Sequence, residues 1–167
     1  DMNHSSDWGQ YGDLQLGDLE KSERWIKRGQ MVLDNAPSSG RAAGTVKTMK
    51  ARHIIESKQW ELQPFTEDLD ATELLALGLS AAHLGDLALA NQVVAKLEKM
   101  LADSPDNGQL KLVHHEVAAL TLHKESMQQA MVDVAKRQQA IELIQEAMII
   151  REGQRAPNGA ATPLKPV

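Results

Sequence analysis

The feature that most constrains this chain is an internal repeat with an offset of 68 residues. Residues 16–19 and residues 84–87 both read Leu-Gly-Asp-Leu. A Pro-x-x-Gly stretch follows each copy, at residues 37–40 and 105–108, and it keeps the same offset. Glycine accepts the positive φ at which many helices end, and aspartate is a favoured cap of the next helix. Each copy therefore predicts a tight turn between two antiparallel helices, and one such hairpin needs neighbours to cover its apolar face.

The offset is twice 34, which is about the length of one tetratricopeptide hairpin. Between residues 74 and 105 a large residue, a Leu-Gly pair, a small residue, a turn glycine and another small residue follow in order: Leu74, Leu77, Gly78, Ala81, Gly85 and Ala90. This order resembles the tetratricopeptide (TPR) pattern. Over about residues 6–152 the chain resembles bacterial TPR-like proteins of mostly unassigned role, although Ser22 stands where the pattern has alanine. The resemblance implies an all-α fold, a right-handed α-α superhelix (a solenoid) of about seven to eight helices in antiparallel hairpins.

Caps and breakers divide the chain into one predicted repeat domain, residues 1–152, and a tail. Ser6 is the expected cap of the first helix, and Asp18 and Asp86 are the expected caps of later ones. The helix that follows Leu69 is expected to start near Asp70 or Thr72. The predicted hairpins cover about residues 6–36, 41–69, 70–104 and 109–152. Pro and Gly are frequent in residues 153–167, which we expect to be a tail or a linker to a further repeat.

The last hairpin contains no Gly or Pro to mark its turn between Gln109 and Glu152. Such a length is long for a single helix, so we predict a long helix to about Ala135 and a second helix from there. A break near Glu125 and Ser126 is the competing interpretation.

The composition favours helix over strand and an aliphatic core. Aromatic residues make up only 3% of the chain, so Leu, Ala, Ile, Val and Met must fill the interior. Trp8, Trp25 and Trp60 are predicted to pack in the core rather than to form a ligand cage. Three methionines are also predicted core residues, with a soft exposed groove as the alternative: Met127, Met131 and Met148.

The absence of cysteine excludes disulfides, thiolate metal sites and a cysteine nucleophile. It fits a reducing cytoplasm and an oxidising periplasm equally, so the compartment stays open. No apolar run is long enough to predict a membrane span. Residues 1–6 do not read as a signal peptide, and residues 164–166 resemble the entry to another helix, so we expect a piece of a longer, soluble protein.

One group of histidines invites a chemical interpretation. The His-His-Glu stretch at residues 114–116, with His123, lacks the i, i+4 histidine pair that zinc requires on a helix. Polar or half-buried helix histidines explain it better, and His53 and His83 are isolated beside apolar residues. No Ser/His/Asp set and no phosphate loop is readable from the spacing, so the sequence predicts no enzyme, no metal and no cofactor.

Nine of the 18 Lys and Arg residues lie between residues 21 and 58. This basic band consists of Lys21, Arg24, Lys27, Arg28, Arg41, Lys47, Lys50, Arg52 and Lys58. A nucleic acid or another anionic partner could dock there, but a solvated helix face explains the band more simply. The net charge of the whole chain is −5, which gives it no general attraction to nucleic acid.

The predicted function is a non-catalytic scaffold that binds a peptide or protein on a helical-repeat surface. The candidate partner contacts are polar positions on the first helices of the hairpins: Gln10, Lys47, Lys50, His83 and Lys111. Two alternatives stay open. One is an adaptor for nucleic acid or another anionic partner through the basic band. The other is a structural segment of a larger solenoid that also self-associates, for example as a homodimer through exposed repeat faces.

Overall fold

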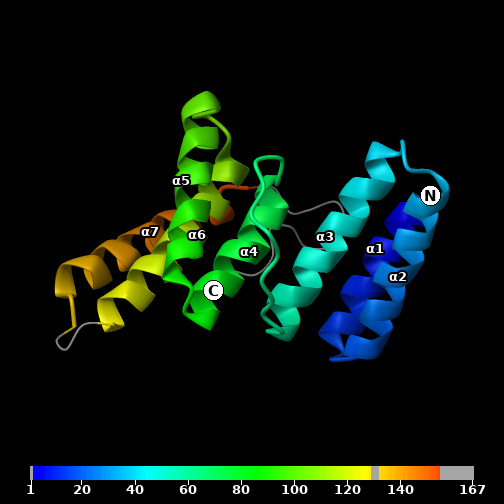
Figure 1. Ribbon diagram of the computed structural model, residues 1–167, viewed down its shortest axis with the longest axis horizontal. Coiled ribbons are helices and arrows are strands. Elements are labelled where there is room, and N and C mark those ends of the chain that lie inside the picture. Colours follow the sequence, from blue (N-terminus) through cyan, green and yellow to red (C-terminus); the bar gives the residue numbers. More distant parts are fainter. Residues whose placement is uncertain (1, 129–131, 155–167) are drawn as a thin grey trace. The chain divides into compact units, whose positions relative to one another are not determined.

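The computed structural model of this protein describes residues 2–128 and 132–154, and these residues form seven α-helices and no strand (Figure 1). The helices are α1 (Met2–Gln15), α2 (Leu19–Asn35), α3 (Gly40–Ser57), α4 (Ala71–Leu84), α5 (Leu87–Asp103), α6 (Gly108–Met127) and α7 (Val134–Glu152). The all-α prediction is confirmed. Among the described residues, no helix combines the length and the apolarity that a membrane crossing requires.

The helices belong to two compact units. Unit 1 contains α1 to α3 within residues 2–59, and unit 2 contains α4 to α7 within residues 60–154. In unit 1 each of the three helices contacts the other two. In unit 2 the same is true of α4, α5 and α6, and α7 packs on α6. The superhelical stacking that the TPR resemblance implies stays a prediction.

The turns of the sequence repeat have the predicted backbone conformation. Gly17 and Gly85 have φ angles of +76° and +84°. The next residues, Asp18 and Asp86, cap α2 and α5 by accepting a hydrogen bond from the backbone N–H three residues further on. Asp70, one of the two expected starts of the fourth helix, caps α4 in a capping box. These local signals act within one helical turn, which is why they are readable in the sequence.

The repeat covers three helices rather than one hairpin. Helices α2 and α5 both have 17 residues and begin at residues 19 and 87. Helices α3 and α6 begin at residues 40 and 108, with the same offset of 68. The set α1–α2–α3 therefore recurs along the chain as α4–α5–α6.

Residues 41–69 do not form the predicted helical hairpin. Helix α3 occupies the first part, and residues 59–70 contain no helix. Pro64 lacks the N–H that a helix needs and disfavours helical geometry in the residue before it. The segment instead runs beside α4, where the Glu61 N–H donates to Ser80 Oγ at 3.4 Å and Trp60 stacks on His83 with ring centroids 4.2 Å apart.

Two predicted helix boundaries are also wrong. Ser6 lies inside α1 instead of capping it, because α1 already begins at Met2. The predicted long helix to Ala135 ends earlier, at Met127, and α7 begins after Asp133, whose side chain accepts from the Lys136 N–H at 3.1 Å. The competing break near residues 125–126 lies closer to the observed end of α6.

The core of unit 2 is apolar and close-packed around α4, in which all residues from Leu74 to Ala82 are buried. Gly78 lets the neighbouring helices approach. A Cβ at this position would come within 2.5 Å of Val117 Cγ1 on α6 and 3.0 Å of Val93 Cγ1 on α5. Such contacts are far below van der Waals distance, so α6 fits against α4 and α5 only because residue 78 has no side chain.

Several predicted core residues lie at the surface. Trp8 is 43% exposed, and its indole N–H donates to His4 Nε2 at 3.0 Å on the same helix, which satisfies its polar atom at the surface. Met127 and Met148 are about half exposed, at 55% and 49%. Trp25 and Trp60 are partly buried. Met131 lies outside the described residues.

Candidate functional site

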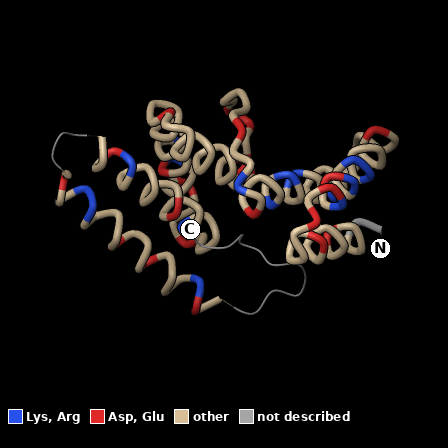
Figure 2. The backbone as a smooth tube through the Cα atoms, turned by 90° about the horizontal axis from the view of Figure 1, so that it is seen from below, with Lys and Arg blue, Asp and Glu red and all other residues tan. Residues whose placement is uncertain are grey.

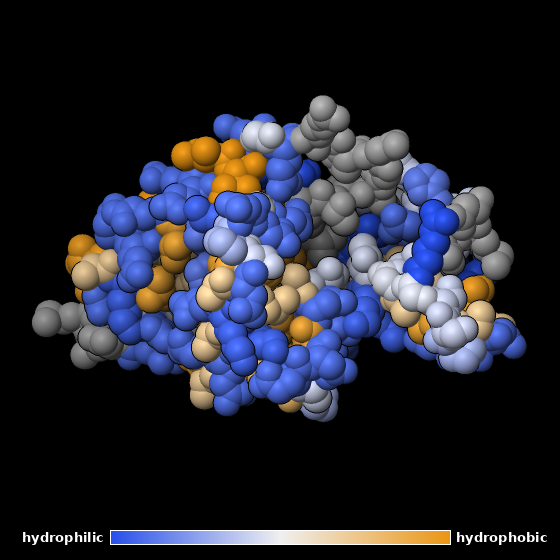
Figure 3. Space-filling view, turned by 90° about the horizontal axis from the view of Figure 1, so that it is seen from above, coloured by the Kyte–Doolittle hydropathy of each residue, from blue (hydrophilic) through white to orange (hydrophobic). Residues whose placement is uncertain are grey.

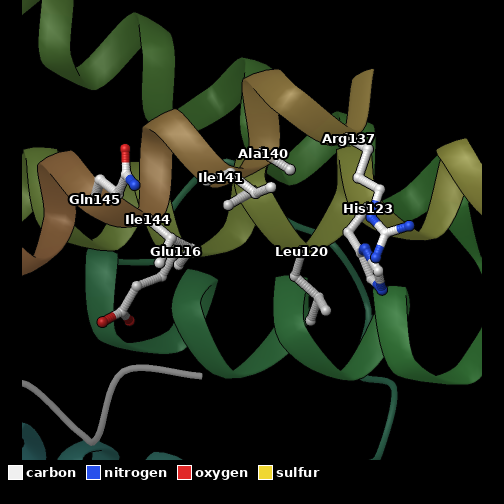
Figure 4. A pocket seen from close by; sticks show the side chains of 9 residues that line it. Glu116, Leu120, His123, Arg137, Ala140, Ile141, Ile144 and Gln145 are labelled. Carbon is white, nitrogen blue, oxygen red and sulfur yellow. The ribbon is translucent and has the colours of Figure 1, made fainter. Parts of the chain in front are cut away.

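A groove of about 390 Å³ lies between α6 and α7 in unit 2 (Figure 4). Its walls are two helical stripes, in which residues recur at intervals of three and four. Helix α6 contributes Glu116, Ala119, Leu120 and His123, and helix α7 contributes Arg137, Ala140, Ile141, Ile144 and Gln145. The middle of the groove is aliphatic, and polar side chains stand toward its ends.

Glu116 is the most unusual residue of the groove. Its side chain is completely buried, and neither carboxylate oxygen has a hydrogen-bond partner among the described residues. Burial raises the pKa of Glu116 from its ordinary value of 4.5 to about 8, against the opposing attraction of the Arg151 cation. The carboxyl group is therefore mostly protonated and neutral at pH 7.

The opposite end of the groove is basic. In Figure 4, Glu116, Leu120 and His123 extend from the same side of α6, and the guanidinium of Arg137 lies beside the imidazole of His123. His123 and Arg137 are both exposed. Glu116 and His123 are seven residues apart, which is two helical turns or about 10.5 Å. The groove thus has an acid at one end, bases at the other and apolar side chains between them.

The matching groove between α4 and α5 is occupied. Helix α6 contacts both α4 and α5, with Val117 over Gly78. No described helix covers the groove between α6 and α7. Apolar side chains of α7 are also exposed, and Figure 3 shows hydrophobic patches on unit 2, at the left of the view. The exposed apolar residues of α7 are Val134 (75% exposed), Ile141 (44%), Met148 (49%) and Ile149 (70%).

The His114–His115 pair lies outside this groove and bridges three helices. His114 Nε2 is 3.7 Å from Glu98 on α5, His115 Nε2 is 3.1 Å from Glu146 on α7, and the two Nδ1 atoms are 3.1 Å apart. Burial lowers the pKa of both histidines. Since their Nε2 atoms face different carboxylates, the pair does not converge on one point, and the described residues hold no group of three His, Asp or Glu suited to a metal ion.

Unit 1 contains a Ser–His–Glu arrangement that the spacing does not reveal. Ser22 Oγ is 2.8 Å from His53 Nδ1, and His53 Nε2 is 4.0 Å from Glu23 Oε1. The serine is completely buried, and its oxygen also accepts from Gln10 Nε2 at 3.2 Å. Gln10 and His53 already use this hydroxyl inside unit 1, so the arrangement is part of the packing of the unit.

One predicted partner contact is wrong. Gln10 is completely buried, and its amide donates to the Met49 carbonyl at 2.6 Å and accepts from Arg52 at 2.8 Å. A side chain whose polar atoms are used inside the unit cannot serve on a binding face.

The other four predicted contacts stay predictions, and the structure does not gather them in one place. Lys47 and Lys50 belong to unit 1, whereas His83 and Lys111 belong to unit 2. His83 is half-buried against Trp60, and Lys50 donates to Gln30 at 3.1 Å. None of the four lines the groove between α6 and α7.

The basic band is less available than its composition indicates. Arg52 is completely buried and bonds to Asp7 at 2.8 Å. Lys21 pairs with Asp18 at 2.7 Å, and Lys27 approaches Glu23 at 3.6 Å. Figure 2 shows acidic positions among the basic ones in unit 1, at the right of the view. Because some of these bases are paired with acids or buried, the surface carries less net positive charge than the nine Lys and Arg residues of the band would give.

Comparisons with protein-family models, with curated proteins and with solved structures gave no match to this chain. The candidate site therefore rests on geometry and charge. Sequence analysis singled out Glu116 and His123 as part of a histidine cluster and missed the groove that contains both. The available signal was the stripe at residues 116, 119, 120 and 123, in which a glutamate stands on a face with alanine and leucine.

Proposed function

We propose that unit 2 is a non-catalytic protein-binding module whose groove between α6 and α7 receives a helix of a partner protein. The observation that carries this proposal is the repeat within the unit. The groove between α4 and α5 is filled by helix α6, whereas the next groove is open and has an apolar floor. The groove between α6 and α7 is the next groove along the chain and is also apolar, so it is suited to a further helix.

The lining of the groove supports a helical occupant over an extended one. Two parallel stripes with helical periodicity form ridges into which the side chains of a third helix can pack. Recognition by an amphipathic helix in a hydrophobic groove uses apolar residues spaced by three, four and seven positions. Ile141 and Ile144 offer aliphatic surface, and Ala119 and Ala140 leave space for the side chains of the partner.

A scaffold role agrees with the TPR-like repeat pattern of the sequence and remains our proposal for the whole chain. The groove presents a neutral acid and two bases separated by about two helical turns, which is too far for a proton relay between them. The exposed apolar residues of α7 favour self-association as the second candidate function. The adaptor for anionic partners has weaker support, because part of the basic band is paired or buried.

A selection from a displayed library of amphipathic helical peptides, with the full chain as target, tests the proposal. Ile141→Glu places a charge in the groove at a position that is 44% exposed, so the fold should survive. Selected peptides should bind this variant at least about tenfold more weakly, because burial of one isoleucine contributes about 1.5–3 kcal/mol.

Ile149→Glu is the matched control, since Ile149 lies on the same helix, is 70% exposed and does not line the groove. It should bind the selected peptides as the unaltered chain does. If no peptide is enriched, or if both variants bind equally well, the groove is not a helix-binding site.

A further inference from the structure

We infer that the helix bound between α6 and α7 carries a lysine or arginine that pairs with Glu116, and an acidic residue two turns away that faces His123 and Arg137. This inference rests on the proposed function and specifies the chemistry of its partner. The occupant is thus an amphipathic helix with two opposite charges seven residues apart and apolar residues between them.

The first ground is the state of Glu116. A carboxyl group that is completely buried without a hydrogen bond is costly, because water has been removed and nothing replaces it. A lysine or arginine that enters the groove would restore charge-assisted hydrogen bonds to both oxygens. Arg151 attracts the ionised form of Glu116 electrostatically, but neither oxygen of Glu116 has a hydrogen-bond partner among the described residues.

The second ground is the polarity of the groove. His123 and Arg137 form its basic end, opposite to Glu116 (Figure 4). A helix with a single orientation satisfies both ends, whereas the reversed helix would bring its acid to the buried carboxyl and its base to Arg137. The base would then repel the Arg137 cation, and the acid would gain no ion pair from the neutral carboxyl group of Glu116. The polarity therefore selects the direction of the bound helix as well as its composition.

The third ground is the size of the space. About 390 Å³ holds several side chains of a helix, including the long aliphatic stem of a lysine or arginine. Such a stem would pack along Leu120 and Ile144, and a rotamer change of Glu116, whose carboxyl group is enclosed in the free protein, would bring the carboxylate to the charged end. A wholly apolar helix would fill the middle of the groove and leave the carboxyl unpaired.

Binding of the cation should release a proton. Glu116 is mostly protonated in the free protein at neutral pH, and pairing with a lysine or arginine favours the ionised form. Arg151 on α7 is the cation that acts on the titration of Glu116, and Arg137 on α7 and His123 on α6 line the far end of the groove. Affinity should therefore increase as the pH rises from 6.5 to 8, by up to tenfold per pH unit.

The test uses the full chain and the peptides of the library selection, compared with Glu116→Gln. Peptides selected on the unaltered chain should be enriched in Lys or Arg at one position and in Asp or Glu seven residues from it. Replacement of that Lys or Arg by Met should weaken binding to the unaltered chain at least about tenfold and binding to Glu116→Gln less than about twofold. Glu142→Gln, an exposed acid of α7 outside the groove, is the control and should behave as the unaltered chain.

Other outcomes separate this inference from the proposed function. Peptides that depend on Ile141 but show no preference for a base would overturn the inference and leave the helix-binding function intact. No binding at all would overturn both. A dimer that Ile141→Glu dissociates would assign the groove to a second copy, and binding that appears only after removal of residues 155–167 would assign it to the chain itself. Either result would overturn the inference.

Discussion

Helices α1–α3 and α4–α6 share their order, their turns and an offset of 68 residues, but their interiors have opposite chemistry. The matched positions show this directly. Gly78, which lets α6 approach α4, corresponds to Gln10, and the buried Ala90 corresponds to the buried Ser22. One set of helices meets through small and aliphatic residues, and the other meets through hydrogen bonds.

The interior of unit 1 is a polar network across all three helices. Gln10 on α1 bonds to Ser22 on α2 and to the Met49 carbonyl on α3. Arg52, also on α3, donates to Gln10 and to Asp7, each at 2.8 Å, and its Nε and second NH₂ group have no partner among the described residues. A buried network of this kind selects one register of the helices more strongly than it stabilises them.

Turns and caps therefore determine the order of the helices, and the residues between them determine whether the helices pack through apolar contacts or through hydrogen bonds. Leu120 stands in unit 2 where unit 1 has Arg52. The same three-helix arrangement accepts either residue because each set is internally consistent. Replacing a single residue of one set by the matching residue of the other set should therefore destabilise the fold, although that residue is native to the other set.

The largest expected effect is from Gly78→Gln, which places the residue of unit 1 in unit 2. Its Cβ would overlap Val117 and Val93, and its amide would be buried among aliphatic groups. Overpacking and an unpaired amide together should lower the free energy of unfolding by about 4 kcal/mol. Urea denaturation of the full chain measures this loss.

Gly108→Gln is the control in the same unit, because the nearest atom to its added Cβ would be Ile150 Cγ2 at 3.9 Å. A similar loss for the two variants would show that the close approach of α4 and α6 does not depend on Gly78.

The second effect concerns the buried charge of unit 1. Asp7→Ala leaves the Arg52 guanidinium buried without its carboxylate and should cost about 3 kcal/mol. The double variant Asp7→Ala/Arg52→Leu carries the residue that unit 2 has at this position, and it should recover most of the loss. A double-mutant cycle by urea denaturation measures the recovery; if the two costs simply add, the comparison of the two interiors fails at this site.

The smallest expected effect on stability concerns the difference between the two buried ionisable side chains, Arg52 in unit 1 and Glu116 in unit 2. Unit 1 buries a charge with a partner, whereas unit 2 buries a carboxyl group without one. The pKa of Glu116 is raised to about 8 in the folded protein. The contribution of Glu116 to the stability of the fold is therefore fully present below the ordinary pKa of glutamate, and it is lost as the pH rises through 8. Between pH 6.5 and 8 the free energy of unfolding should fall by about 1–2 kcal/mol, at about 1.4 kcal/mol for each pH unit over which the proton is retained.

Glu116→Gln should remove this slope, and Glu142→Gln should keep it. The window starts at pH 6.5 because burial lowers the pKa of His114 and His115, and their contribution has the opposite sign and is lost on acidification. Chemical denaturation at a series of pH values measures the slope. An equal slope in all three proteins would mean that Glu116 is not buried as the structure indicates.

The candidate site was only partly predictable. Residues 116 and 123 stand out in the sequence because histidine and glutamate attract chemical interpretation, and residues seven positions apart on a helix share a face. The aliphatic wall on α7 carries no such signal. Its role depends on the turn after Met127, and the predicted continuation of the helix to Ala135 would have displaced that wall.

The sequence by itself determined the helical class, the repeat and most of the caps. Gly17, Gly85, Asp18 and Asp86 act on backbone groups within a few residues, so their effect is the same in any fold that keeps those neighbours.

Only the tertiary structure decided which side chains are enclosed. Gln10 is buried because Met49 and Arg52, about 40 residues away, satisfy its amide. Glu116 is completely buried in the folded unit, and nothing close to it in the sequence announces the lost hydration. Burial is a property of segments that meet in space, and it is therefore the structure that turned a glutamate on a helix into the candidate site.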